Sequence, residues 1–160
     1  MAHELEIVNG NAQMAYVGDV PWHGLGTKVP ADLTPEQFMV KAGLDWTVEK
    51  EDILTRSGIK VKNKQALVRS SDGSILDVVG TGWNPVQNSE AFNFFEEYVN
   101  AGDMEMHTAG SLKDGQMVWA LAKTKDSFEL FNGDQTDNYF LFTNPHQFGK
   151  AINIRMTPIR

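Results

Sequence analysis

Cysteine is absent from the 160-residue sequence, which excludes disulfide bonds, thiolate metal sites and a cysteine nucleophile. No apolar run approaches the roughly 20 residues that a membrane-spanning helix needs. The N-terminus also lacks the basic segment and apolar stretch of a secretion signal. These absences predict a cytoplasmic protein in a reducing compartment, without a membrane partner.

Motifs of enzyme active sites are missing as well. Neither a Walker-type Gly-Lys-Ser/Thr sequence nor a serine-centred nucleophile elbow occurs. The segment Pro21-Trp22-His23-Gly24-Leu25-Gly26 lacks the flanking strand and helix of a phosphate-binding loop, so we interpret it as a tight turn anchored by Trp22, with ligand contact as the alternative. The four histidines, none closely spaced, are His3, His23, His107 and His146. We expect no catalytic residues, no metal and no cofactor.

The charge balance is acidic, because 14 Lys and Arg stand against 21 Asp and Glu and give a net charge of −7 at pH 7. Bulk attraction to nucleic acid is therefore not expected, since basic contacts to phosphates supply most non-specific affinity. Apolar residues make up 41% and charged residues 22% of the chain, as in ordinary globular domains. The composition predicts a packed core.

The chain divides at about residue 33. Glycine and proline interrupt residues 1–33 so often that we expect an irregular N-terminal arm packed on the rest of the domain. Residues 34–160 are predicted to form an α+β domain, a largely antiparallel meander sheet of about seven or eight strands with two helices packed on it. The sequence stops directly after a strand, so we expect this domain to be truncated at its C-terminal end.

Two helices are predicted from their end signals. A capping box at Thr34 and Gln37 begins the first, and Gly43 ends it. The second begins at a cap, Asn88 or Ser89, and ends at about residue 100. Apolar residues on this second helix recur every three or four positions and should face the sheet. They are Ala91, Phe92, Phe95, Tyr98 and Val99.

Strands are predicted from alternating side chains and from turn signals. A single strand precedes three hairpins, whose turns contain Asp-Gly or Asn-Gly pairs. The expected strands are residues 44–54, 59–69 with 74–80, 104–111 with 117–123, 127–131 with 138–143, and 151–156. The three turns are Ser71-Asp72-Gly73, Lys113-Asp114-Gly115 and Asn132-Gly133-Asp134.

One basic cluster interrupts the acidic chain, and it consists of Arg56, Lys60, Lys62, Lys64 and Arg69. Because the three lysines alternate along a predicted strand, they should project from one face. Such a row is typical of a phosphate-contacting surface, and equally of an edge strand that lysines protect from aggregation. Base stacking would need exposed aromatic neighbours. Trp83, Tyr139 and Phe148 are candidates that also suit the core.

Three segments resemble the phage/plasmid-like family whose domain is catalogued as of unknown function. They are Trp22-His23-Gly24-Leu25-Gly26, Trp83-Asn84-Pro85-Val86-Gln87-Asn88 with Glu90-Ala91-Phe92, and Thr157-Pro158-Ile159-Arg160, in matching order along essentially the whole chain. The resemblance implies an origin in a bacteriophage, prophage or plasmid, a bacterial host cell and no established catalytic residues. Family members usually continue past the last segment. A fold-level analogy connects the chain with ring-forming single-strand annealing proteins of phage recombination.

Three functions are compatible with the sequence. The leading hypothesis is a phage- or plasmid-encoded protein of DNA metabolism that binds or anneals single-stranded DNA in recombination or replication. The alternative is a non-enzymatic protein-interaction module acting on host or phage machinery, which an acidic surface suits as well. Homo-oligomers fit both hypotheses. The third is an unrecognised hydrolase, for which no nucleophile and base can be named.

Overall fold

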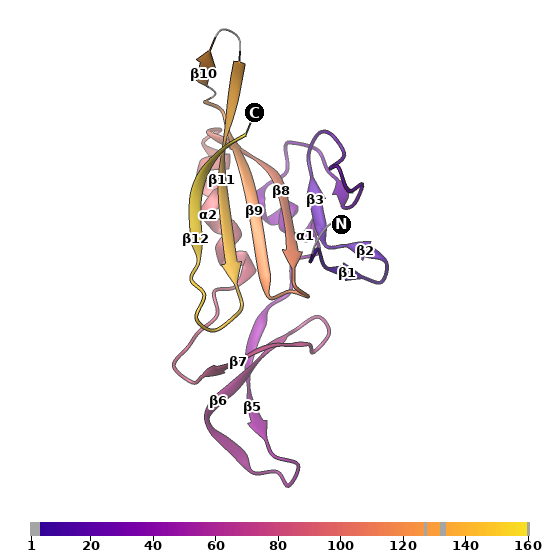
Figure 1. Cartoon of the computed structure of the whole chain (residues 1–160), viewed down its shortest axis with the longest axis vertical. Helices are drawn as coiled ribbons and strands as arrows, with labels where there is room; N and C mark the ends of the chain where they lie inside the picture. The colour runs from indigo at the N-terminus through magenta and orange to yellow at the C-terminus, as the bar shows by residue number, and fades with distance from the viewer. Residues whose placement is uncertain (1–3, 127, 132–133, 160) are drawn as a thin grey trace.

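The computed structural model describes residues 4–126, 128–131 and 134–159. In chain order its elements are β1 (Ile7–Val8), β2 (Asn11–Ala12), β3 (Met14–Tyr16), β4 (Thr27–Lys28), α1 (Pro35–Lys41), β5 (Val48–Leu54), β6 (Lys60–Arg69), β7 (Ile75–Gly80), α2 (Asn88–Asn100), β8 (Met104–Leu112), β9 (Met117–Thr124), β10 (Phe128–Phe131), β11 (Asp134–Pro145) and β12 (Asn153–Ile159) (Figure 1). The short β3 and β4 pair in parallel, and the other described pairs are antiparallel. The predicted α+β class with two helices and mostly antiparallel strands is confirmed.

The expectation of one meander sheet of seven or eight strands is wrong. The described strands form three sheets, of two, seven and three strands. The three-stranded sheet of β5, β6 and β7 projects from one end of the molecule (Figure 1). Turn signals in the sequence specify which neighbouring strands pair in a hairpin, but they carry no information about which hairpins share an edge.

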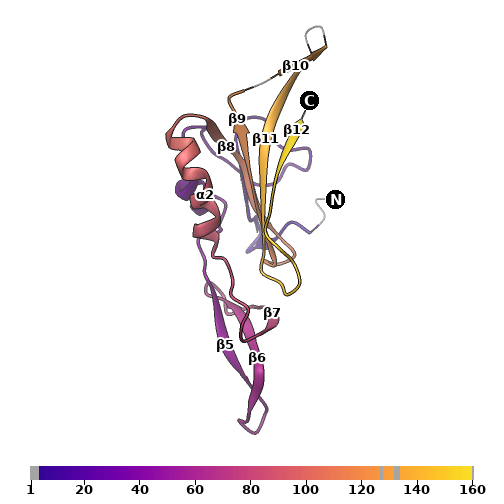
Figure 2. The ribbon, with the colours of Figure 1, turned by 90° about the vertical axis from the view of Figure 1, so that its left-hand side faces the viewer.

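The main sheet has the strand order β10-β11-β9-β8-β3-β4. Strand β12 also pairs with β11, along the edge opposite β9. Both helices lie on one of its faces, and α2 is seen there from the side in Figure 2. Phe92 and Phe95 of α2 are fully buried, and the Phe95 ring centroid lies 6.1 Å from that of Phe142 on β11. The predicted buried face of the second helix is therefore confirmed, although Tyr98 near its end is exposed.

Local capping explains where both helices begin. The Thr34 hydroxyl accepts the Gln37 amide at 3.1 Å, and the Gln37 side chain accepts the Thr34 amide at 3.0 Å, as the capping box predicts. The cap of α2 is Gln87 rather than Asn88 or Ser89, because the Asn88 side chain is buried and bonded elsewhere. No helix within the described ranges is long and apolar enough to cross a membrane.

Several strand limits differ from the expected ranges. Residues 44–47 precede β5 without strand pairing, β11 begins at Asp134 instead of residue 138, and β12 covers 153–159 instead of 151–156. Long-range pairing explains the last difference, because Thr157, Pro158 and Ile159 lie opposite β11 residues. Of the residues expected in turns, strands and motifs, His3, Ser127, Asn132, Gly133 and Arg160 lie outside the described part of the chain.

Residues 4–33, expected as an irregular arm, contribute strands to the body. The hairpin of β1 and β2 is followed by β3, which is buried and pairs with β8 in the register Ala15↔Ala109. Loops rich in glycine connect these strands. The arm is thereby built into the main sheet through backbone hydrogen bonds.

Candidate functional site

Four of the five predicted cations lie at the free end of the small sheet. Lys64 pairs with Gly80 of β7, but toward Lys60 the described part of β6 has only β5 beside it. The end of the sheet is therefore a two-stranded ribbon without a third strand. Lys60, Lys62 and Lys64 are exposed on β6, and Arg56 is exposed in the turn between the strands.

The strict alternation expected across the three lysines is interrupted. Asn63 has a φ of +60°, which is a left-handed conformation inside the strand. The register of β5 against β6 also shifts, from Asp52↔Gln65 to Leu54↔Lys60. Such a bulge bends a strand and re-aims its side chains, so the cations form an exposed cluster and not a regular one-faced row.

Ion pairing separates these cations into two groups. The Lys60 ammonium lies 3.1 Å from an Asp52 carboxylate oxygen, and the hydrogen bond from Lys60 lowers the pKa of Asp52. No described carboxylate lies within ion-pair distance of Arg56, Lys62 or Lys64. Three positive charges at the end of the ribbon are therefore available to a ligand.

The fifth cation, Arg69, lies at the opposite end of β6 and is only 5% exposed. Its guanidinium pairs with Glu6 and with Asp72, and it lies 5.3 Å from the ring centroid of Trp46. Hydrogen bonds from Arg69 hold the pKa of the Asp72 carboxyl well below its usual value. The structure does not bring Arg69 together with the other four cations, and its charge is compensated inside the protein.

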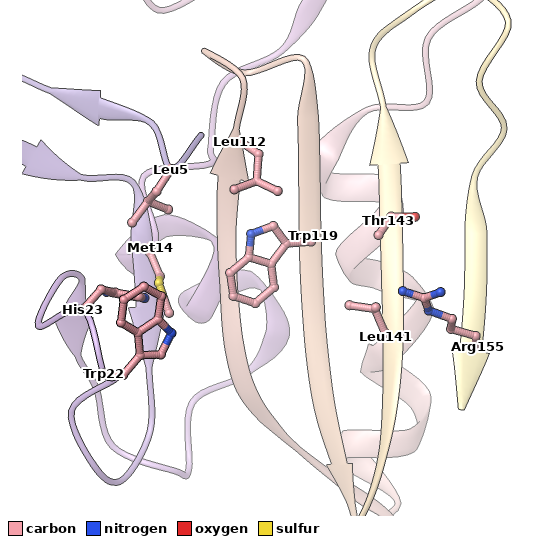
Figure 3. A pocket seen from close by; sticks show the side chains of 9 residues that line it. All are labelled: Leu5, Met14, Trp22, His23, Leu112, Trp119, Leu141, Thr143 and Arg155. Carbon is pink, nitrogen blue, oxygen red and sulfur yellow. The ribbon is translucent and has the colours of Figure 1, made fainter. Parts of the chain in front are cut away.

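A second feature is a hollow of about 490 Å³ on the face of the main sheet away from the helices (Figure 3). Alternation along β9 explains its floor: Val118 and Ala120 point into the helix-covered core, and Trp119 between them lines the hollow. Trp22 and Arg155 border the same hollow from the N-terminal loop and from β12. Figure 3 shows the two indoles and the guanidinium spread across this face.

The turn predicted at residues 21–26 is present, but Trp22 does not anchor it. The Gly24 amide donates to the Pro21 carbonyl at 2.8 Å, and the Leu25 amide donates to Nδ1 of His23 at 3.0 Å. The Trp22 side chain is 80% exposed. His23 therefore holds the turn, and the turn presents Trp22 to solvent at the hollow.

The three aromatic residues considered for base stacking have different environments. Tyr139 is buried, and Trp83 is partly buried against the core. Phe148 is 67% exposed, in the loop after β11. Sequence reasoning missed Trp119 and Arg155, although the apolar residues on both faces of β9 are a signal of a second apolar surface.

The Trp83-to-Asn88 segment connects three parts of the fold. The Gln87 side chain accepts the Val48 amide at 2.9 Å and donates to the Val48 carbonyl at 2.8 Å. Asn88 donates to the Leu44 carbonyl at 2.9 Å, and the Val86 carbonyl accepts a hydrogen bond from Asn144 at 2.8 Å. This arrangement gives the motif a structural role at the start of α2.

The described residues contain no group of three or more His, Asp or Glu side chains placed to hold a metal ion. His107 lies partly buried on the main sheet, 5.1 Å from the Tyr139 ring centroid, and burial lowers its pKa. The described surface offers exposed cations at the ribbon, and indoles and a guanidinium at the hollow.

A family model described as a domain of unknown function, DUF932, matches residues 75–160. The match includes the segments that begin at Trp83 and Thr157, but not the one that begins at Trp22. No curated protein and no solved structure matches the chain. Because the family model covers more than half of the 160 residues, the protein belongs to the DUF932 family, whose shared domain has an unknown function.

Proposed function

We propose that the protein binds single-stranded DNA, as a phage- or plasmid-encoded protein of recombination or replication in the cytoplasm of a bacterial host. The observation that carries the proposed binding is the exposed cation cluster at the end of the β5–β6 ribbon. The proposed origin and process rest on the resemblance of the three sequence motifs to phage and plasmid proteins.

The position of the cations suits contact with phosphates. Glu49 and Glu51 of β5 pair in register with Val68 and Ala66, which lie nearer the body of the protein. A phosphate at the ribbon end therefore meets cations before it meets these carboxylates. Basic side chains of this kind contact phosphates without reading sequence.

The geometry favours a single strand over a duplex. The bulge at Asn63 spaces the cations irregularly, and a flexible single strand can adjust its phosphates to irregular spacing. A duplex carries a charge about every 1.7 Å along its axis, so a body with net charge −7 repels it more strongly. We therefore expect weak binding to duplex DNA.

A specific observation also favours a second candidate function, a protein-interaction hairpin. Leu54 and Ile59 are large apolar residues that are exposed at the same end of the ribbon as the cations. Exposed apolar side chains surrounded by charges are found at protein interfaces. A partner with an acidic, apolar surface would fit this combination.

The DNA-binding proposal is tested by anisotropy of a labelled oligothymidylate at several salt concentrations. The test variant combines Arg56→Gln, Lys62→Gln and Lys64→Gln. Each lost phosphate contact flattens the slope of log affinity against log salt by about 0.7, so the triple variant should lower the slope by about 2. Affinity should fall similarly for every base sequence, because phosphate contacts carry no base information.

A control variant with the same charge change separates the ribbon from bulk electrostatics. It combines Lys41→Gln, Lys125→Gln and Lys150→Gln, which are exposed positions on the main body. This control should retain the parent salt slope. If both triple variants behave alike, or if the parent protein does not bind the oligonucleotide, the DNA-binding role of the ribbon is wrong.

A further inference from the structure

We propose that the hollow on the uncovered face of the main sheet is a nucleobase-binding subsite. In it, a base of the bound strand stacks on Trp22 at one side, and a phosphate farther along the same strand contacts Arg155 at the opposite side. This inference rests on the proposed DNA binding and adds a site that is separate from the cationic ribbon. The argument comes from the indoles, the apolar floor and the polar groups at the border of the hollow.

Trp22 is presented to solvent by a hydrogen-bonded turn. Its side chain is 80% exposed, while the Pro21–Gly24 and His23–Leu25 hydrogen bonds hold the backbone on either side of it. Within the described structure, the only aromatic ring that packs against the indole is that of His23, which meets it edge-on with 5.4 Å between the ring centroids. A large face of the indole is therefore open, and base stacking on such a face contributes about 1–3 kcal/mol per base.

The floor of the hollow suits a flat ring. Leu112 on β8, Trp119 on β9 and Leu141 on β11 project from three adjacent strands and line it (Figure 3). A volume of about 490 Å³ falls within the range of about 300–1,000 Å³ that small-molecule sites occupy. A nucleotide can therefore lie over this surface without displacing the backbone.

The polar groups at the border select an anionic ligand rich in acceptors. Arg155 is exposed, and no described carboxylate lies within ion-pair distance of it. Nδ1 of His23 accepts the Leu25 amide, so the proton of the neutral ring is on Nε2, which donates. No aspartate or glutamate is among the described residues that line the hollow. In a chain of net charge −7, this is a local preference for phosphate and base carbonyl groups.

The test compares an oligothymidylate with an abasic deoxyribose-phosphate strand of equal length. The parent protein should bind the base-bearing strand more tightly. Trp22→Ala should weaken binding to oligothymidylate about 5- to 150-fold, the equivalent of one stacked base, and leave abasic binding unchanged. Arg155→Gln should lower the salt slope by about 0.7 for both strands.

Trp22→Phe and Phe148→Ala serve as controls. The first keeps a stacking ring and should retain most of the base-dependent affinity, and the second removes an exposed aromatic outside the hollow and should have no effect. If Trp22→Ala binds oligothymidylate like the parent while the ribbon variant loses affinity, the subsite is wrong and the proposed function stands. If the parent binds neither strand, both fail. An acidic aromatic peptide that quenches the Trp22 fluorescence where DNA does not would also overturn the subsite.

Discussion

A single buried imidazole shows how the fold controls the charge of one residue. The His146 ring is fully buried, with Nε2 2.9 Å from Oδ1 of Asn88. Because Nδ2 of Asn88 donates to the Leu44 carbonyl, its Oδ1 is the acceptor and Nε2 of His146 carries the proton. Nδ1 has no hydrogen-bond partner among the described residues. The ring is neutral, and burial lowers its pKa to about 4.

This lowered pKa predicts that the protein loses stability in mild acid. The unfolded chain takes up a proton near the ordinary histidine pKa of 6.5, and the folded protein does so only near 4. The free energy of unfolding should therefore be largest above pH 6.5 and fall by about 1.4 kcal/mol per pH unit between these two values. Urea denaturation of the parent and of His146→Gln between pH 7 and about 5 measures it, because the variant lacks this proton uptake. Equal pH slopes for both proteins would contradict the neutral, buried ring.

At the scale of the elements, the start of α2 is joined to the small sheet by one side chain. Gln87 completes the helix cap with Glu90, and its amide group also bonds both backbone groups of Val48, the first residue of β5. A side chain that pairs with a backbone in this way continues the edge of the sheet. The start of α2 and the beginning of β5 are therefore held in a defined relation.

Replacing this side chain should weaken both elements. Gln87→Ala leaves the partly buried Val48 groups without partners and should cost about 1–3 kcal/mol of unfolding free energy. In Gln87→Ala, hydrogen exchange at the Val48 amide should be faster than in the parent protein. The increase should exceed the one that the lower global free energy of unfolding would cause by itself. Gln65→Ala is the control, because Gln65 donates only to an exposed Asp52 carboxylate. A Val48 amide whose protection is unaltered in Gln87→Ala would show that the side chain does not hold this junction.

At the scale of the whole molecule, a buried ion pair connects parts that lie far apart in the chain. Glu6 from the N-terminal segment pairs with Arg69 at the end of β6 and accepts the hydroxyl of Ser111 on β8 at 2.7 Å. Gly115 lies against the same guanidinium, since an added Cβ there would be 2.6 Å from an Arg69 nitrogen. The N-terminal segment, the small sheet and the main sheet meet at this cluster.

Breaking this cluster should destabilise the entire domain. Arg69→Met leaves the Glu6 carboxylate buried without its cation and should cost about 3–5 kcal/mol. The double variant Glu6→Leu with Arg69→Met should lose less than the sum of the single variants, because neither charge is then left alone. Lys60→Met, which breaks an exposed pair, should not shift the urea midpoint measurably. Additive losses in the double variant would show that the two residues act independently.

Some of the fold could be predicted because its signals are local. The first helix was predicted from a capping box and a terminal glycine, and Gly43 indeed has a φ of +76°. The hairpin of β8 and β9 was predicted from the turn at Lys113, where three consecutive residues have positive φ. The helix end and the turn depend on the conformational preferences of a few adjacent residues, so the structure of the rest of the chain has little influence on them.

The candidate sites were only partly predictable for the opposite reason. The exposed lysines are close together in the sequence, so a local pattern predicts their cluster. The burial of Arg69 depends on its ion pair with Glu6, which is 63 residues away in the sequence. Trp22, Trp119 and Arg155 come from three distant segments and share a hollow only because β3, β8, β9, β11 and β12 lie in one sheet. No local pattern contains that information.

The sequence by itself determined the α+β class, both helices, the hairpin turns at Ser71 and Lys113, and the location of a basic segment in an acidic chain. Each of these follows from short-range sterics, capping and side-chain periodicity. The tertiary structure decided that the strands divide into three sheets, that Arg69 is a buried ion-pair partner, and that Trp22 stands exposed at a hollow that Trp119 and Arg155 also line. Those outcomes depend on which distant surfaces bury one another, and that burial is settled only when the whole chain packs.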